Sequence, residues 1–201
     1  MKKYFTIVLA IVCTSIYAQK LKVVQGDFGF IVGQKEVNVE FNYSNVKLLK
    51  ENYSNQEYVT KRSADLEEKA RGKGKTWEKA WDSSRDLIWN PKFLELANKY
   101  LEKNEGIYFA EELADAKYTL IVDVVWIYPG WDAGIMKQPA KVTTNLKFVE
   151  TANKDNVLLE VSSKNAPGDQ YGNNFSNENR VGEGFAKTAK SFAKLILKKA
   201  F

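Results

Sequence analysis

The chain of 201 residues contains no histidine. Without an imidazole it cannot form a Ser-His-Asp triad, a Cys-His pair or a histidine-ligated zinc site. The chemistry that remains belongs to carboxylates, lysine, serine, threonine and tyrosine. Among 25 acidic residues, pairs of carboxylates arise by chance, so no pair is singled out as catalytic. We therefore expect a protein that is not an enzyme and that uses no metal ion or other cofactor. A carboxylate-dependent hydrolase is kept as a third possibility, which would need two paired acids in a cleft.

Cysteine is nearly absent, and the single one, Cys13, lies in an unusual amino-terminal segment. Lys2 and Lys3 precede an apolar run from Tyr4 to Val12, and the segment closes with Ala18. A charged start, a short apolar stretch and a small residue before the cleavage point are typical of a secretory signal peptide. The apolar run is too short for a membrane-spanning helix, which needs about 20 residues. The sequence thus predicts a signal peptide over residues 1–18.

Cleavage after Ala18 would leave residues 19–201 as the mature chain. Cys13 raises the alternative of a lipid anchor, but the bulky Val12 directly before it fits a lipid-modified cysteine poorly. The expected location is therefore periplasmic or secreted, with no transmembrane helix after removal of the signal, and association with the outer membrane stays open. A mature chain without Cys13 has no disulfide and no thiolate metal site.

The excess of positive charge is small. The formal net charge of +5 falls to +3 when Lys2 and Lys3 leave with the signal. A nearly balanced, exported chain without a basic recognition motif is not expected to bind nucleic acid. The segment Gly72–Lys75 contains glycines but lacks the preceding strand and the Ser/Thr spacing of a phosphate-binding loop. About 180 residues suffice for one domain with an ordinary core.

Spacing and end signals predict three or four helices. Ser54 and Glu57 have the spacing of a capping box, which begins a mostly polar helix that ends near Gly72. Thr76 can cap a second helix, and Pro91 then begins a third, which ends at Gly106. The second helix and a closing helix each carry one core-facing stripe, formed by Trp77, Ala80, Trp81, Ser84 and Ile88 in the first case and by Phe185, Ala189, Phe192 and Ile196 in the other.

Alternating apolar residues predict the strands. Residues 28–32 and 37–43 have the pattern of a hairpin around Gly33. The run 118–127 is apolar on both faces, which is typical of a central strand covered on both sides. Its expected partners are a strand with one apolar face at 140–148 and a further strand at 157–163. The predicted fold is a single α+β domain over residues 19–201, with an antiparallel or mixed sheet of about five strands packed by three to four helices.

A resemblance adds to this pattern. A helix ending at Leu101, the short strand 107–109 and the step Ala114-Asp115-Ala116-Lys117-Tyr118 lead into a meander and a closing helix. This order resembles small α+β domains of the curli-secretion lipoprotein and TolB amino-terminal type, over roughly residues 90–201. Other segments resemble uncharacterised secreted proteins of Gram-negative bacteria, namely 74–77, 90–93, 128–130 and 179–181. The resemblance implies an envelope location and a binding or assembly role, and it transfers no catalytic residue.

The candidate binding residues lie mainly around the stretch that ends the long strand. Pro129 and Gly130 occur where the chain must turn, so they need no functional explanation. The span from Tyr128 to Gln138 is longer than a two-residue hairpin loop, however, and longer loops more often carry binding sites. Tyr128 and Trp131 are therefore the first candidates. Trp89, which lies off the stripe that places Trp77 and Trp81 in the core, is the third.

These observations favour an exported, non-catalytic envelope protein that binds another envelope component. A protein partner is the first expectation, and the alternative is a carbohydrate or peptidoglycan fragment bound by the aromatic residues. The polar loop from Asn165 to Arg180 offers oxygens from Asp169, Asn173, Asn174 and Glu178. It lacks the spacing of a calcium-binding EF-hand, so we predict no metal there.

Overall fold

A computed structural model of the chain describes residues 19–168 and 175–201. The predicted signal peptide and three of the four loop residues considered for calcium, Asp169, Asn173 and Asn174, lie outside these ranges. Within them, no helix combines the length and the apolar character needed to cross a membrane.

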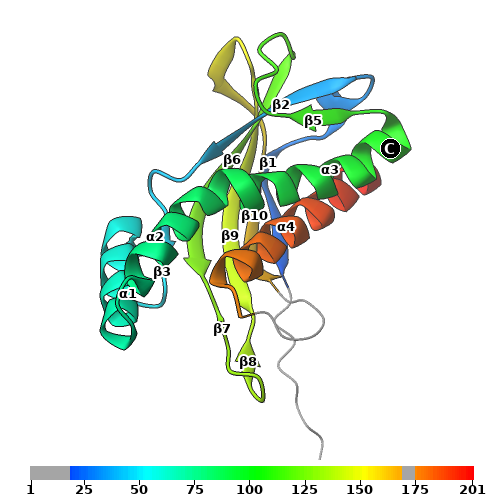
Figure 1. Cartoon of the computed structure of the whole chain (residues 1–201). Coiled ribbons are helices and arrows are strands. Elements are labelled where there is room, and N and C mark those ends of the chain that lie inside the picture. Colours follow the sequence, from blue (N-terminus) through cyan, green and yellow to red (C-terminus); the bar gives the residue numbers. More distant parts are fainter. Residues whose placement is uncertain (1–18, 169–174) are drawn as a thin grey trace, which may run out of the picture.

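The described residues form one mixed sheet of eight strands and a separate two-stranded ribbon, β7–β8. The main path through the sheet runs β1-β10-β9-β6-β2-β5, and β3 joins β6 at one end and carries β4 (Figure 1). The strands are β1 Lys20–Gly26, β2 Glu36–Asn42, β3 Lys47–Leu48, β4 Tyr53–Ser54, β5 Tyr108–Ala110, β6 Tyr118–Tyr128, β7 Trp131–Asp132, β8 Lys137–Gln138, β9 Ala140–Glu150 and β10 Asn153–Gly168.

The first part of the sheet is not the predicted hairpin. Residues 29–31 form a turn of 3-10 helix, and β2 pairs in parallel with β5 and β6 rather than with the residues before it. The alternating pattern of residues 37–43 correctly predicted the strand β2, but the strands that pair with β2 come much later in the chain. Parallel neighbours need a crossover connection, which the helices after β2 supply. Residues 28 and 31 are nevertheless buried, because this turn packs on the core.

Four α-helices are present: α1 Asn55–Lys69, α2 Lys73–Ser84, α3 Asn90–Glu105 and α4 Asn177–Ala200. The predicted capping box of α1 and the end of α3 at Gly106, which has a left-handed backbone, are confirmed. The predicted cap of α2 is wrong, since α2 begins after Gly72 and the Thr76 hydroxyl donates back to the Gly72 carbonyl. Between α2 and α3 the chain continues through a π-helical turn, Arg85–Trp89.

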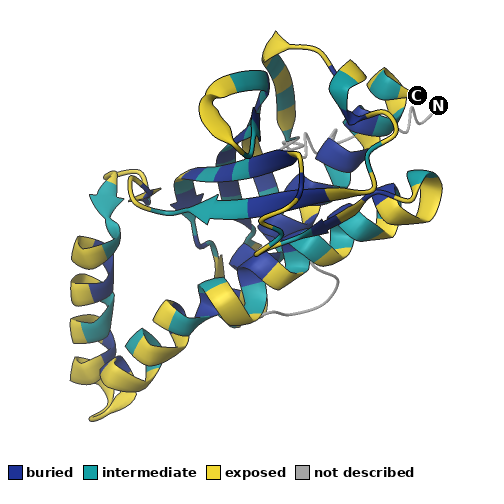
Figure 2. Cartoon of the chain, turned by 90° about the horizontal axis from the view of Figure 1, so that it is seen from above, coloured by how far each residue is buried: buried dark blue, intermediate teal, exposed yellow. Residues whose placement is uncertain are grey.

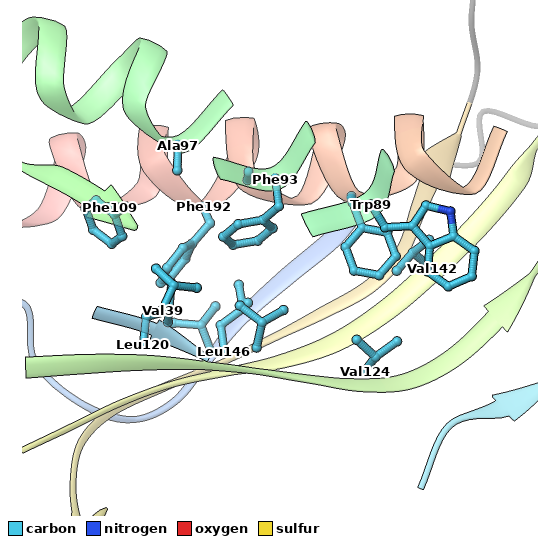
Figure 3. Close-up of a cluster of buried hydrophobic side chains, with 14 of the residues drawn as sticks. Val39, Trp89, Phe93, Ala97, Phe109, Leu120, Val124, Val142, Leu146 and Phe192 are labelled. Carbon is cyan, nitrogen blue, oxygen red and sulfur yellow. The ribbon is translucent and has the colours of Figure 1, made fainter. Parts of the chain in front are cut away.

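Helices α3 and α4 lie side by side across one face of the sheet, while α1 and α2 extend beyond its side (Figures 1 and 2). The stripe predicted for the closing helix is confirmed, because Phe185, Ala189, Phe192 and Ile196 are all buried. Figure 3 shows Phe192 and Phe93 pointing from the two helices toward Val39, Leu120 and Leu146 of the sheet. This single layer of side chains is the core.

The opposite face of the sheet is open. Leu120, Val122 and Val124 of β6 are fully buried under the helices, whereas Ile121 is half-buried and Val125 is 36% exposed. The strand is central in the sheet, as expected, but the prediction that it is covered on both faces is wrong. Both long helices lie on the same side, so apolar residues on the other face of β6 stay in contact with water (Figure 1). The α+β class is confirmed, with more strands than the five expected.

Candidate binding pocket

A pocket of about 420 Å³ lies where α1 faces the end of β6 and the beginning of β7. Three parts of the chain that are distant in sequence build it: the β3–α1 region, the β6–β7 turn and the first residue of α4. The side chains and backbone that line it belong to Leu49, Glu51, Tyr53, Tyr58, Lys61, Arg62, Asp65, Tyr128, Pro129, Gly130, Trp131 and Asn177.

Helix α1 supplies one wall through Tyr58, Lys61, Arg62 and Asp65. Tyr58 lies three and four positions before Lys61 and Arg62, and Asp65 lies four and three positions after them, so the helical repeat brings the four residues to one side. The capping box fixes where this helix begins: the Ser54 hydroxyl accepts from the backbone N–H at position 57, and the carboxylate there accepts from the Ser54 N–H at 2.8 Å. The register of the wall therefore follows from the helix start.

The second wall is the turn between β6 and β7. Gly130 has φ +67°, and a Cβ at this position would lie 2.4 Å from the Gln138 carbonyl oxygen, so only glycine fits. The side-chain carbonyl Oε1 of Gln138 accepts hydrogen bonds from the Tyr128 hydroxyl at 2.8 Å and from the Trp131 indole N–H at 3.2 Å. Tyr128 also stacks on Trp126, with ring centroids 6.2 Å apart. Two aromatic side chains of the pocket are thus held by one amide.

Arg180 at the start of α4 fixes the same turn from behind. Its Nε donates to the Pro129 carbonyl at 3.1 Å and its Nη2 to the Gly130 carbonyl at 3.2 Å. Its guanidinium also contacts the Asn177 side chain. Burial lowers the pKa of Arg180 from its ordinary value, whereas the nearby carboxylate of Asp132 acts in the opposite direction. The arginine positions the backbone of the pocket wall.

Tyr58 is the buried aromatic side chain of the α1 wall, with 6% of its surface exposed. Its hydroxyl accepts from the Asn177 amide at 3.4 Å, and its ring contacts Trp77 and Trp81. Burial raises the pKa of Tyr58 to about 12, so the phenol is neutral at physiological pH and keeps its proton for donation.

Charged groups of both signs complete the lining. The Lys61 ammonium lies 5.2 Å from the centroid of the Tyr53 ring, and carboxylates come from Glu51 and Asp65. The Nε of Arg62 is buried and has no hydrogen-bond partner among the described residues. Aromatic surfaces beside donors and acceptors are the features of a site for a polar ring-containing ligand.

The structure brings two of the three predicted binding residues together. Tyr128 and Trp131 both line the pocket, and Trp131 is 42% exposed. Trp89 does not, because it is 1% exposed, stacks on Phe185 with centroids 5.7 Å apart and donates its indole N–H to the Glu178 carbonyl. Figure 3 shows Trp89 among the core side chains. The expectation that Trp89 offers a binding surface is therefore dropped. Trp81 is buried as predicted, and Trp77 is partly buried.

Sequence reasoning missed the wall that α1 contributes. The spacing of Tyr58, Lys61 and Arg62 was present in the sequence, but a mostly polar helix does not reveal which of its faces meets another segment. On β6, away from the pocket, Asp123 accepts a hydrogen bond from the Asn42 amide at 3.0 Å.

Other hollows on the described surface offer less. One of about 610 Å³ lies beside β2, where Glu40 forms an ion pair with Lys154 at 2.8 Å. Among the described residues, no group of three or more acidic side chains is placed to hold a metal ion.

Comparison with known proteins gives only distant similarities. No family model matches the chain, and no curated protein does. The PelC dodecamer from Paraburkholderia phytofirmans is a similar solved structure, with 12% identity, a TM-score of 0.38, and coverage of 86% of this chain and 96% of that one. A single-substitution variant of that dodecamer gives 11% identity, a TM-score of 0.34, and coverage of 88% and 98%. Similarity at this level carries no conclusion about function.

Proposed function

We propose that this chain is an exported, non-catalytic binding protein of the cell envelope, and that its pocket takes a saccharide. One observation carries the proposal: Tyr128 and Trp131 are fixed by the same Gln138 at the edge of a pocket of about 420 Å³. Small-molecule sites commonly have volumes of about 300–1,000 Å³. A rigid aromatic side chain gives a ligand a large apolar contact area at little entropic cost.

The polar lining supports a saccharide over a purely apolar ligand. A sugar has apolar C–H faces, which suit the Trp131 ring, and hydroxyl groups, which suit the carboxylates of Glu51 and Asp65. Export is supported by the amino-terminal pattern from Lys2 to Ala18. The absence of histidine supports binding without catalysis, because it removes the commonest general base.

The proposal is tested by calorimetric titration of the purified protein with envelope saccharides, including peptidoglycan fragments. Trp131→Ala should weaken binding of whichever saccharide binds the unchanged protein by at least about tenfold, as loss of a stacking aromatic does at hot spots. The matched control is Tyr108→Ala, an aromatic side chain that is 46% exposed and lies outside the pocket. Equal affinities for the unchanged protein and Trp131→Ala would reject the pocket as the site.

A second candidate is a protein partner, favoured by the turn between β7 and β8. Ile135 is 99% exposed and Met136 is 66% exposed, and together they form an apolar tip on a projecting ribbon (Figure 1). Exposed apolar groups of this kind mark interaction surfaces. Co-purification from envelope extracts with the double substitution Ile135→Ser and Met136→Ser tests this. Loss of one defined partner from the double variant supports the candidate. Recovery of the same proteins with the unchanged chain and with the double variant rejects it.

A further inference from the structure

The unpaired Nε of Arg62 points to the kind of saccharide that the pocket takes. We infer that Arg62 is the specificity-determining residue and that it selects saccharides bearing an anionic group, either a carboxylate or a phosphate. This inference rests on the proposed function, since it assigns a ligand class to the same pocket. Four features of the site carry it. They are the unpaired Nε of Arg62, the paired guanidinium of Arg180, the ammonium of Lys61, and the two carboxylates of Glu51 and Asp65.

Arg62 lines the pocket, and its Nε is buried without a hydrogen-bond partner among the described residues. A buried donor without an acceptor costs free energy, and the cost is greater when the donor belongs to a charged group. Buried polar atoms are for that reason almost always paired. An acceptor supplied by a ligand would remove this cost at the Nε of Arg62, and the free energy gained there would favour binding.

Arg180 gives the contrast within the same region. Its guanidinium donates to two backbone carbonyls, those of Pro129 and Gly130, and contacts Asn177. The guanidinium of Arg180 therefore stabilises the backbone of the β6–β7 turn. Burial is the main cause that lowers the pKa of Arg180, and repulsion by the charge of Arg62 lowers it further. An anion bound at Arg62 would also relieve this repulsion.

Lys61 is the second cation on the same wall. Its ammonium lies 5.2 Å from the Tyr53 ring centroid, and its side chain is exposed. A guanidinium binds carboxylate or phosphate oxygens through two parallel N–H groups, whereas an ammonium acts as a point charge. Arg62 therefore gives geometric selection of the anionic group, and Lys61 adds attraction near the mouth of the pocket.

Two carboxylates also line the pocket, those of Glu51 and Asp65. Neither forms an ion pair with Arg62 in the described part of the chain. Acceptors of this kind suit the hydroxyl groups of a sugar, so they do not compete for the role of Arg62. The resulting arrangement has a sugar ring on the side of Trp131 and its anionic substituent toward α1.

The experiment compares neutral sugars with derivatives that carry an anionic group. The purified protein is titrated by calorimetry with three sets, based on glucose, galactose and N-acetylglucosamine. Each set contains the neutral sugar, its 6-phosphate and an acidic derivative, which is the uronic acid for the first two and the 3-O-lactyl ether N-acetylmuramic acid for the third. The inference predicts that at least one anionic member binds about tenfold or more tightly than its neutral parent, as a charge-assisted hydrogen bond in a site shielded from water allows. The carboxylate and phosphate members identify the source of the anionic group.

Arg62→Gln should abolish this preference and leave the affinity for the neutral parent within about threefold, because glutamine keeps a donor but loses the charge. Arg62→Lys, which keeps the positive charge, should retain part of the preference for the anionic sugars. The control is Arg71→Gln, an exposed arginine outside the pocket, which should change nothing. Binding of neutral parents as tightly as their anionic forms, or a preference that survives in Arg62→Gln, overturns the inference and leaves the saccharide proposal standing. Absence of binding by all three sets overturns both.

Discussion

At the scale of single residues, Gln138 joins two aromatic side chains of the pocket. Gln138 lies on β8 and is half-exposed. Its side-chain carbonyl oxygen accepts hydrogen bonds from both Tyr128 and Trp131. Neither aromatic side chain needs this bond in order for the sheet to form, because both lie at the edge of the fold. The amide therefore acts on the position of the rings rather than on the core.

Replacing Gln138 with Ala separates these two effects. We expect a loss of about 1 kcal/mol in the free energy of unfolding, the usual value of a hydrogen bond at a partly exposed position. Affinity for the saccharide should fall more than this, because two ring orientations are lost at once. Urea unfolding and calorimetric titration of the same sample measure both quantities. An unchanged affinity would show that the rings are positioned without Gln138.

Substitutions of two tryptophans, Trp89 and Trp131, should differ in their effect on the free energy of unfolding. Trp89→Ala should lower the free energy of unfolding by about 3–5 kcal/mol, because it empties a fully buried position. Trp131→Ala should cost within about 1 kcal/mol, as expected for a residue that is 42% exposed. Urea melts of the two variants decide this. Similar losses at both sites would mean that Trp131 covers the core instead of lining a binding site.

The place of Trp131 in an exposed turn could be predicted because it depends on local facts, namely a strand end and a loop longer than its turn requires. The place of Trp89 could not. A regular helix would put Trp89 off the stripe of Trp77, Trp81 and Ser84, but the π-helical turn Arg85–Trp89 inserts one extra position into the repeat. The stripe then resumes at Trp89 and continues through Phe93, and no residue type in the turn announces that shift.

At the scale of elements, α1 connects a sequence motif to the pocket. Its capping box sets the start of the helix, and the lining residues follow at fixed positions from that start. The Ser54 backbone N–H, and next its hydroxyl, donate to the Glu57 carboxylate and hold the pKa of that group below its ordinary value. The same box could be predicted from four letters of sequence, because capping is a local interaction.

Glu57→Gln should therefore have an effect that depends on pH. Since the pKa of Glu57 is lower in the folded than in the unfolded chain, its ionised form stabilises the fold above the ordinary carboxyl pKa. That contribution is lost as the pH falls through the lowered pKa. Urea unfolding should show the unchanged protein as the more stable at pH 7, with the difference shrinking in acid. Glu68→Gln, at an exposed position of the same helix, is the control. A difference that is constant with pH would contradict the account.

The strands show where prediction from elements stops. The apolar stripes of β9 and α4 were predicted correctly, because a period of two or of 3.6 is visible in the sequence itself. The partners of β2 were not, since pairing with β5 and β6 depends on a return of the chain after three helices. The one-sided cover of β6 was missed for the same reason: which face receives α3 and α4 is decided by topology rather than by the residues of β6.

At the scale of the whole molecule, the pocket exists because of how distant segments meet. Residues near positions 58, 128 and 177 come together only when α1, the β6–β7 turn and the start of α4 are all in place. Arg180 connects the β6–β7 turn with the start of α4, since it lies in α4 and donates to the carbonyls of the turn. No local pattern shows such a meeting, and for that reason the lining residues outside the β6–β7 turn could not be predicted.

The pocket is lined by α1, the β3–α1 region, the β6–β7 turn and the first residue of α4, and Trp131 in this lining is 42% exposed. A saccharide can therefore reach Trp131 without a rearrangement of the core. This is why we expect substitutions in the pocket to change binding with little effect on folding, and substitutions at core positions to do the reverse.

The central claim, that Trp131 and α1 together form a saccharide site, is tested most directly by nuclear magnetic resonance. The chain has five tryptophans, and each gives one indole N–H signal. During titration with the tightest-binding saccharide, we predict that the Trp131 signal moves together with the backbone amide signals of Tyr58 and Arg62, while the signal of the buried Trp89 stays in place. Movement confined to residues outside the pocket, with the Trp131 and Arg62 signals unchanged at saturation, would contradict the account.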